Sequence, residues 1–282
     1  MRCAPEGISL QVLGSGGPRA GTDRASASYL VWMEGRARVM IDAGGGAFVR
    51  FGEAGASLAD LRFLGLSHFH PDHVSDLSAL LWLSDTMRGE PLPIAGPSGN
   101  DAFPSLDQLL GRLFDSEEGA FRVLSGTLGG PGRGVRLEPT TVDVADHAPV
   151  TLLAATSLTV RALSVPHTNS PALAYRIDAE GTSLVFGGDQ TGEDARFVDF
   201  ARDADVLVMH MAIGPSATGP VLDIHATPAR VGEVARVAGV ERLVLSHLVD
   251  EQTELEAGVA EVRQQYRGPV DVARDLDCFR AD

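Results

Sequence analysis

The chain has 282 residues, 44% of them hydrophobic and 22% charged, with a formal net charge of −15. This length allows one or two domains with a large buried core, and no apolar run approaches the roughly 20 residues that span a bilayer. All basic residues are arginines that form no dense cluster, and an acidic surface repels a long polyanion, so nucleic acid is an unlikely substrate.

The first half of the chain alternates between short strand patterns and helical patterns. Strands are expected at 8–14, 28–33, 37–41, 62–66 and 91–95, and helical spacing at 48–55, 74–81 and 103–114. The Gly-rich stretch 126–134 lacks the Lys-Ser/Thr ending and following helix of a phosphate-binding loop, so we expect a connection there.

The second half repeats this organisation. Strands are expected at 158–165, 172–178, 183–186, 206–209, 242–245 and 270–273, with a helix at 228–238. Strands thus cluster in two groups, each followed by helices. This pattern predicts an α/β fold with two similar layered halves around one core, forming a single domain over residues 1–282.

The chain termini offer few signals. The sequence from Met1 moves almost directly into a strand pattern without a signal-peptide core, so a cytoplasmic protein is the default expectation, although a trimmed export signal would leave the same appearance. Cys3 and Cys278 lie near opposite ends and belong to no metal or redox motif. We expect both to be incidental, unpaired thiols.

The segment 67–73, Ser-His-Phe-His-Pro-Asp-His, is the most informative motif of the chain. His68 and His70 are two residues apart and therefore point to the same side of an extended segment. Asp72 and His73 follow at a turn, where their side chains can diverge toward a second position. The alternative is a polar loop with chance histidines. The spacing favours a site that holds two cations a few ångströms apart.

Three further ligand candidates follow predicted strands. They are His167, Asp189 and His247. Each alone could be a cap or turn residue. Because strand ends present side chains to a common cleft in α/β folds, their recurrence together with the cluster favours a functional site.

These residues carry a resemblance to the metallo-β-lactamase superfamily, whose pattern is an early Asp, an H-x-H-x-D-H cluster, and then His, Asp and His. The matching residues are Asp42, His68, His70, Asp72, His73, His167, Asp189 and His247. The resemblance extends over roughly residues 8–248. It implies a four-layer αββα sandwich.

Two segments are similar to the ribonuclease Z-like branch of that superfamily. One is 13–18, Leu-Gly-Ser-Gly-Gly-Pro, and the other is 225–228, His-Ala-Thr-Pro. The resemblance implies that His225 assists the leaving group or stabilises the transition state; the alternative is a contact of His225 with backbone near a helix start. In that branch a His-Glu pair precedes the segment that corresponds to 225–228. Here the pair is His210-Met211, so the carboxylate is missing. The stretch 98–150 also carries only four arginines in place of a basic tRNA-binding arm.

The resemblance further implies how the ligands divide between two metal ions. The first ion takes His68, His70 and His167, the second takes Asp72, His73 and His247, and Asp189 bridges them. Zinc suits these ligands best, with manganese or iron as alternatives. Asp72 and His225 are the catalytic candidates. Asp42 would orient a ligand histidine, unless it has only a structural role at its strand end.

The expected activity is hydrolysis of a small phosphodiester or related ester by a hydroxide that bridges the two metal ions. The same hydroxide can attack a carbonyl, so lactones, carboxylic esters and β-lactams stay open as substrates. Processing of tRNA 3′ ends and non-catalytic metal binding are further alternatives. A small molecule and a second copy of the chain in a homodimer are the expected partners. His147 is given an ordinary turn role, and His210 either packs in its strand or contacts a metal ligand.

Overall fold

The computed structural model describes residues 3, 6–19, 23–82, 90–249 and 251–281. Within them the chain forms two seven-stranded mixed sheets. The order of strands in the first sheet is β14 (Cys278–Arg280), β1 (Ile8–Gly14), β2 (Ser28–Met33), β3 (Arg36–Ile41), β4 (Phe63–Gly65), β5 (Leu92–Pro97) and β6 (Leu137–Val142). The order in the second is β13 (Val270–Val272), β12 (Arg242–Leu248), β11 (Val206–Met211), β10 (Thr182–Phe186), β9 (Ala172–Ala179), β8 (Leu158–Val165) and β7 (Val150–Ala155).

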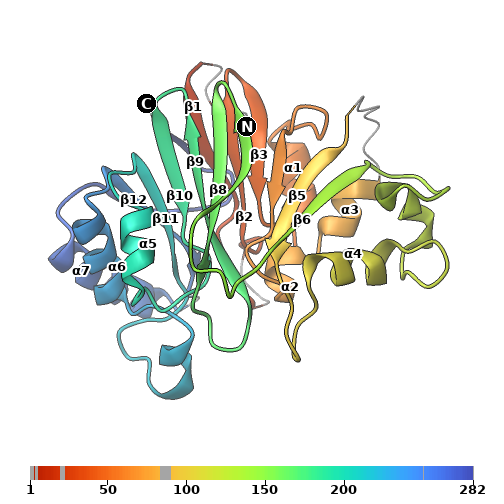
Figure 1. Ribbon diagram of the computed structural model, residues 1–282. Helices are drawn as coiled ribbons and strands as arrows, with labels where there is room; N and C mark the ends of the chain where they lie inside the picture. Colours follow the sequence, from red (N-terminus) through yellow and green to blue (C-terminus); the bar gives the residue numbers. More distant parts are fainter. Residues whose placement is uncertain (1–2, 4–5, 20–22, 83–89, 250, 282) are drawn as a thin grey trace.

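Helices cover the outer face of each sheet (Figure 1). Those on the first sheet are α1 (Ala47–Glu53), α2 (Pro71–Val74), α3 (Leu77–Trp82), α4 (Leu106–Phe114) and the 3₁₀ helix η1 (Arg122–Leu128). Those on the second are α5 (Ala195–Phe200), α6 (Pro228–Ala238) and α7 (Gln252–Gln265), with the 3₁₀ helix η2 (Gly219–Asp223) before α6. No helix in the described part of the chain is long and apolar enough to cross a membrane.

Three layers of apolar side chains hold this arrangement together. The central layer lies between the sheets and contains Leu10, Ile41, Tyr175 and Phe186. One outer layer joins the first sheet to its helices, and the other joins the second sheet to α5, α6 and α7. Burial of this apolar surface is the dominant favourable contribution to folding. The order of layers, helices, sheet, sheet and helices, confirms the predicted four-layer αββα sandwich.

The strands that carry the ligand candidates are parallel in each sheet. In the first sheet β3, β4 and β5 run parallel, and in the second β10, β11 and β12 run parallel. Their carboxyl ends therefore meet at one edge of the sandwich. The chain loops that leave this edge are the natural place for a site.

The expectation of free thiols is wrong, because Cys3 and Cys278 form a disulfide with a Cα–Cα distance of 5.7 Å. The pairing follows from the sheet: Cys278 lies in β14, the edge strand beside β1, and Cys3 precedes β1 by a few residues. Since two positions 275 residues apart in sequence are brought together only by the finished sheet, no local pattern predicts this bond.

Candidate metal centre

Five elements deliver side chains to the shared edge of the two sheets. His68 follows β4, and His70, the N-cap of α2, precedes Asp72 and His73 in its first turn. His167 follows β8, Asp189 follows β10, and His247 lies inside β12. A register shift between β11 and β12 coincides with a φ of 47° at His247, and this irregularity turns its ring toward the edge.

Three groups of ligand atoms converge there. Within each group the atoms lie no more than 4.8 Å from one another. The groups are His68, His70 and His167; His68, His73 and Asp189; and Asp72, His73 and His247. The structure thus brings together all seven metal-ligand candidates of the sequence.

Hydrogen bonds at the rear of two rings orient the opposite nitrogen of each ring toward the other ligand candidates. His73 Nδ1 donates to Asp42 Oδ2 at 2.8 Å, and His167 Nδ1 donates to the Ile224 carbonyl at 2.9 Å. The Nε2 atom of His73 is buried and has no hydrogen-bond partner among the described residues. A buried polar atom without a partner is costly, so a cation that replaces the proton on this nitrogen would fit the site.

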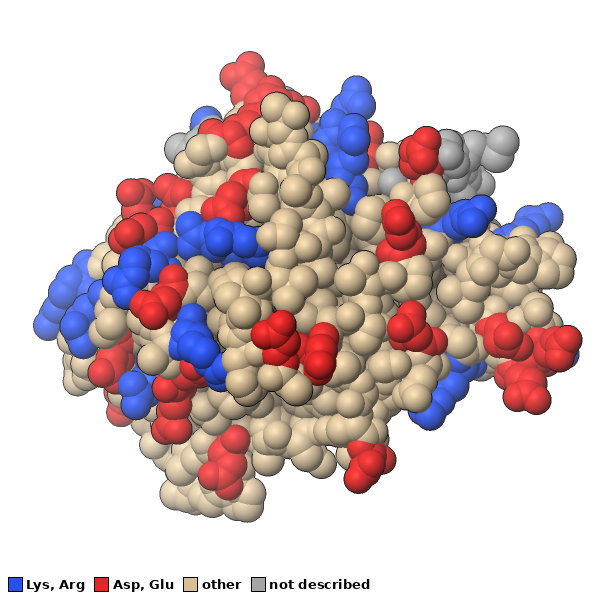
Figure 2. Space-filling model, viewed as in Figure 1, with Lys and Arg blue, Asp and Glu red and all other residues tan. Residues whose placement is uncertain are grey.

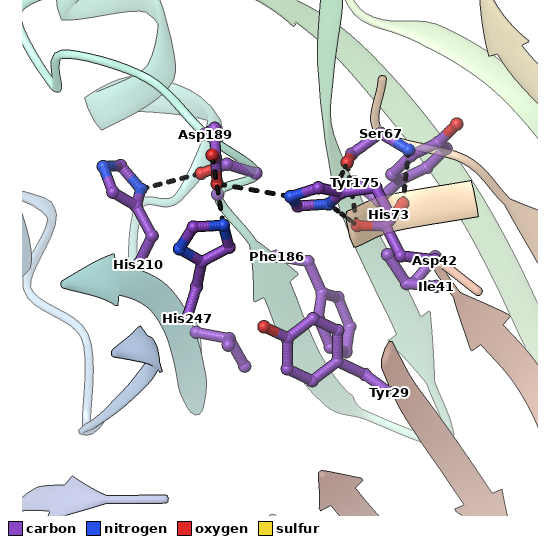
Figure 3. A pocket seen from close by; sticks show the side chains of 13 residues that line it. Tyr29, Ile41, Asp42, Ser67, His73, Tyr175, Phe186, Asp189, His210 and His247 are labelled. Carbon is purple, nitrogen blue, oxygen red and sulfur yellow. Dashed lines mark hydrogen bonds and ion pairs between the residues drawn. The ribbon is translucent and has the colours of Figure 1, made fainter. Parts of the chain in front are cut away.

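Asp42 is held in place by more than its imidazole partner. Its Oδ1 accepts the Ser67 backbone N–H at 2.7 Å and its Oδ2 accepts the Ser67 hydroxyl at 2.8 Å. Figure 3 shows Asp42 and Ser67 on one side of His73, with Asp189 and His247 on the other. The expected orienting role of Asp42 toward a ligand histidine agrees with these contacts. Sequence reasoning missed Ser67, whose signal is a polar residue between an apolar strand and the first histidine.

Two carboxylates lie between two of the imidazoles. Asp72 Oδ2 is 3.1 Å from His247 Nε2 and 3.5 Å from His73 Nε2, and Asp189 reaches the same two nitrogens at 3.4 and 3.8 Å. Burial opposes charge on His73, yet the carboxylates of Asp42 and Asp189 raise its pKa to about 9. Burial likewise disfavours the Asp189 anion, but the facing imidazoles hold its pKa well below the usual range. The site therefore stores negative charge that a cation can neutralise.

His225 and His210 complete the wall beside Asp189. His225 Nδ1 lies 3.8 Å from Asp189 Oδ2, and its ring centroid is 5.5 Å from that of His167. Burial and the neighbouring His210 lower the pKa of His225 to about 3. His147 lies apart in an exposed turn, where its ring contacts the Ser164 hydroxyl. Sequence reasoning gave His210 no definite role, although a histidine inside the apolar run of β11 was a signal.

Comparisons with known proteins agree with this geometry. Residues 37–248 match the family described as "Beta-lactamase superfamily domain". A Mycobacterium avium protein named Ribonuclease Z is 30% identical, with 98% of this chain and 99% of that protein aligned. Human tRNase Z, short form, has a TM-score of 0.75 at 18% identity over 97% of this chain and 99% of its own. A diphosphatase of the PhnP family has a TM-score of 0.66 at 17% identity, with 96% and 97% covered.

These relatives correct one expectation. Nucleic acid was expected to be an unlikely substrate, yet a relative that aligns with nearly the whole chain is named Ribonuclease Z. The net charge of −15 misled because it averages over the whole surface, whereas phosphate responds to the local potential at a site. On the face drawn in Figure 2, Arg side chains alternate with Asp and Glu side chains, so charge of both signs is spread over this surface.

The site geometry and the sequence comparisons lead to the same assignment. The His and Asp groups are suited to a dinuclear metal site, and the family match covers all seven of these residues. The chain belongs to the metallo-β-lactamase superfamily, in its ribonuclease Z-like part, and is a metal-dependent hydrolase.

Proposed function

We propose that this protein hydrolyses phosphodiesters with two divalent cations bound at the shared sheet edge. One cation would take the ring nitrogens of His68, His70 and His167, and the other would take Asp72, His73 and His247, with Asp189 between them. The proposal is supported by the convergence of these atoms. Zinc is the preferred ion because imidazole and carboxylate ligands suit it, with manganese and iron as alternatives.

A pair of bound cations lowers the pKa of water toward neutrality and neutralises charge on the attacked phosphoryl oxygen. The residues of the chain do the rest. Asp42 fixes the tautomer of His73 through its 2.8 Å hydrogen bond. Asp72 lies between two imidazoles and is only 10% exposed, so it is placed to bind a cation and to accept the proton that the attacking water releases.

The observation that carries the phosphodiester assignment is the position of His225. Its ring lies beside both ligand groups, and its Nδ1 is buried with no hydrogen-bond partner in the described part of the chain. Because its lowered pKa keeps the ring neutral near pH 7, it would act as an N–H donor to an oxygen that gains charge in the transition state. The relatives named ribonuclease Z and diphosphatase also act on phosphorus centres by name.

The test is turnover of bis(p-nitrophenyl) phosphate by the purified chain. Activity should disappear on chelation and return with zinc or manganese. The double variant His68→Ala and His73→Ala should lose turnover because each proposed cation loses a ligand, whereas His147→Ala, an exposed histidine, serves as the matched control. Unchanged turnover in the double variant would contradict the proposal.

A substrate panel separates the phosphodiester from the carbonyl alternatives. It compares kcat/KM for the diester, a small cyclic phosphodiester, a precursor tRNA with a 3′ extension, a lactone, p-nitrophenyl acetate and a chromogenic β-lactam. A phosphodiester of either size should be preferred. Preference for the lactone, acetate or β-lactam would overturn the assignment while leaving the metal centre intact.

A further inference from the structure

His210 is a buried histidine that belongs to none of the converging ligand groups found among the described residues. It lies near the end of β11 and is 4% exposed. Its ring centroid is 5.3 Å from that of His225 and 6.5 Å from that of His247. Figure 3 shows it on the opposite side of Asp189 from His73. A buried imidazole in this position needs a partner for each ring nitrogen.

Both ring nitrogens of His210 are engaged with backbone atoms. Nδ1 lies 2.9 Å from the Gly188 carbonyl oxygen, which can only accept, so Nδ1 carries the proton. Nε2 accepts the Ala226 N–H at 3.1 Å. These two partners select one neutral tautomer. They also leave His210 no lone pair for a cation, which excludes it as a ligand in this arrangement.

Each backbone partner is one residue away from a side chain of the site. Gly188 precedes Asp189, and Ala226 follows His225. The Asp189 loop is tight, since Gly188 has a φ of 61° and a Cβ there would lie 2.8 Å from the Leu173 carbonyl oxygen. The Ala226 N–H is shared between two acceptors, His210 Nε2 at 3.1 Å and the Gln190 carbonyl oxygen at 2.7 Å, and the second of these contacts joins the two loops directly. The imidazole of His210 therefore fills the space between them and holds both.

We propose that His210 is a positioning residue that fixes Asp189 relative to His225 by donating a hydrogen bond to one loop and accepting one from the other. The proposal rests on the metal-binding part of the proposed function and is independent of the substrate. It gives a structural reason for the polar side chain inside the apolar strand β11. The next residue, Met211, stands where the ribonuclease Z-like branch has a Glu. The His210 ring therefore provides a polar contact to the His225 loop without that carboxylate.

Two substitutions separate the two hydrogen bonds. The amide of Asn reaches the position of the imidazole Nδ1, whereas the longer amide of Gln reaches the position of Nε2. His210→Asn therefore keeps the donor to Gly188 and loses the acceptor for Ala226. His210→Gln keeps the acceptor and loses the donor. His210→Ala removes both, and His147→Ala is the matched control at an exposed histidine.

The expected results differ between the two variants. His210→Gln should lower zinc affinity roughly 10- to 100-fold in a chelator competition assay, because lost support of a ligand loop costs about that much. His210→Asn should keep zinc affinity and lower kcat roughly tenfold with a smaller change in KM. It should also speed amide hydrogen exchange at Ala226, by less than a complete loss of acceptors would, because the Gln190 carbonyl still accepts that N–H. The exchange measurement uses metal-free protein, so it tests the positioning role without any cation.

Thermal unfolding of the metal-free variants controls for general loss of stability. Equal losses of zinc affinity in the Asn and Gln variants, or unchanged Ala226 exchange in His210→Asn, would overturn the inference. Failure of the wild-type chain to bind two zinc ions would instead refute the proposed metal centre. In that case the Ala226 exchange alone decides the role of His210.

Discussion

Asp42→Asn tests how strongly the metal centre depends on a residue that is not itself a proposed ligand. Asp42 has a φ of 60°, a left-handed conformation that Asn also adopts readily, so the substitution leaves the backbone unstrained. The carboxylate accepts three hydrogen bonds: one from the Ser67 backbone, one from the Ser67 hydroxyl and one from His73 Nδ1. Asn offers one oxygen and one NH₂ group in the same space.

Either orientation of the Asn amide damages the site. If its oxygen faces the Ser67 N–H, its NH₂ faces His73 Nδ1, and His73 must then carry its proton on Nε2, where the cation would bind. If the amide is reversed, the buried Ser67 N–H loses its acceptor, which costs about 1–3 kcal/mol. Loss of such an orienting partner lowers metal affinity roughly 10- to 100-fold, equivalent to about 1.4–2.7 kcal/mol.

The metal-free protein should also lose stability. A pKa of about 9 for His73, against about 6.5 for a free imidazole, is a contribution of at most about 3 kcal/mol at 1.36 kcal/mol per unit. Because the folded pKa is raised, this contribution is complete below pH 6.5 and is lost as the pH rises through 9. Asp189 and Asp72 supply part of it, so the substitution should remove less than the whole.

The assay is competition between the protein and a fluorescent chelator for zinc, with both sites resolved. The site of His73 should weaken, and the site of His68, His70 and His167 should keep its affinity. Asp60→Asn is the matched control, since its carboxylate is 34% exposed, pairs with Arg36 at 3.6 Å and belongs to none of the ligand groups found in the described part of the chain. Two sites of wild-type affinity in Asp42→Asn would refute the reasoning.

Three further predictions follow from the site and the termini. His225→Ala should lower kcat/KM roughly 10- to 100-fold while the metal content measured by atomic absorption stays unchanged; loss of metal would contradict its assigned role. Burial lowers the pKa of His210 to about 4, so its contribution to metal-free stability is constant above pH 6.5 and falls by about 3 kcal/mol toward pH 4. Urea titrations should therefore show a flatter pH dependence for His210→Asn. Cys278→Ser should lower the free energy of unfolding by about 2–4 kcal/mol, and an unchanged urea midpoint would argue against the Cys3–Cys278 bond.

The sequence was sufficient to predict the architecture because the strand patterns are short, apolar and bounded by turns. The strands around Leu10, Ile41 and Phe186 were expected, and all are buried in the central layer. The ligand candidates could be predicted for a related reason. His68, His70, Asp72 and His73 lie within six residues, and the others lie after or near the carboxyl ends of strands that meet at one edge.

Other elements could not be predicted because their partners are distant in sequence. The edge strand β14 is only three residues long and partly exposed, and it exists because it pairs with β1 at the other end of the chain. The helix α7 is different, because its buried residues Leu255, Gly258, Val259 and Val262 follow the i, i+3, i+4, i+7 spacing of a helical stripe, so a sequence signal for it was present and was overlooked. The expectation that nucleic acid is an unlikely substrate failed for a different reason. Composition gives the net charge of the chain but not where the charged side chains lie on the surface.

Function imposes local conformations that no propensity would select. Asp42 and His247 both have left-handed φ values, 60° and 47°, and each such residue costs of order 1–3 kcal/mol. Asp42 lies between the buried Ile41 and Ala43, and His247 lies between the buried Ser246 and Leu248, so the packed layers can hold both conformations. Beside them, His73 Nε2 and His247 Nδ1 are buried without a hydrogen-bond partner among the described residues. A cation that binds only the folded state would offset this strain. The stabilisation would grow with the logarithm of the ratio of cation concentration to dissociation constant. Zinc should therefore raise the unfolding temperature of the wild-type chain more than that of Asp42→Asn.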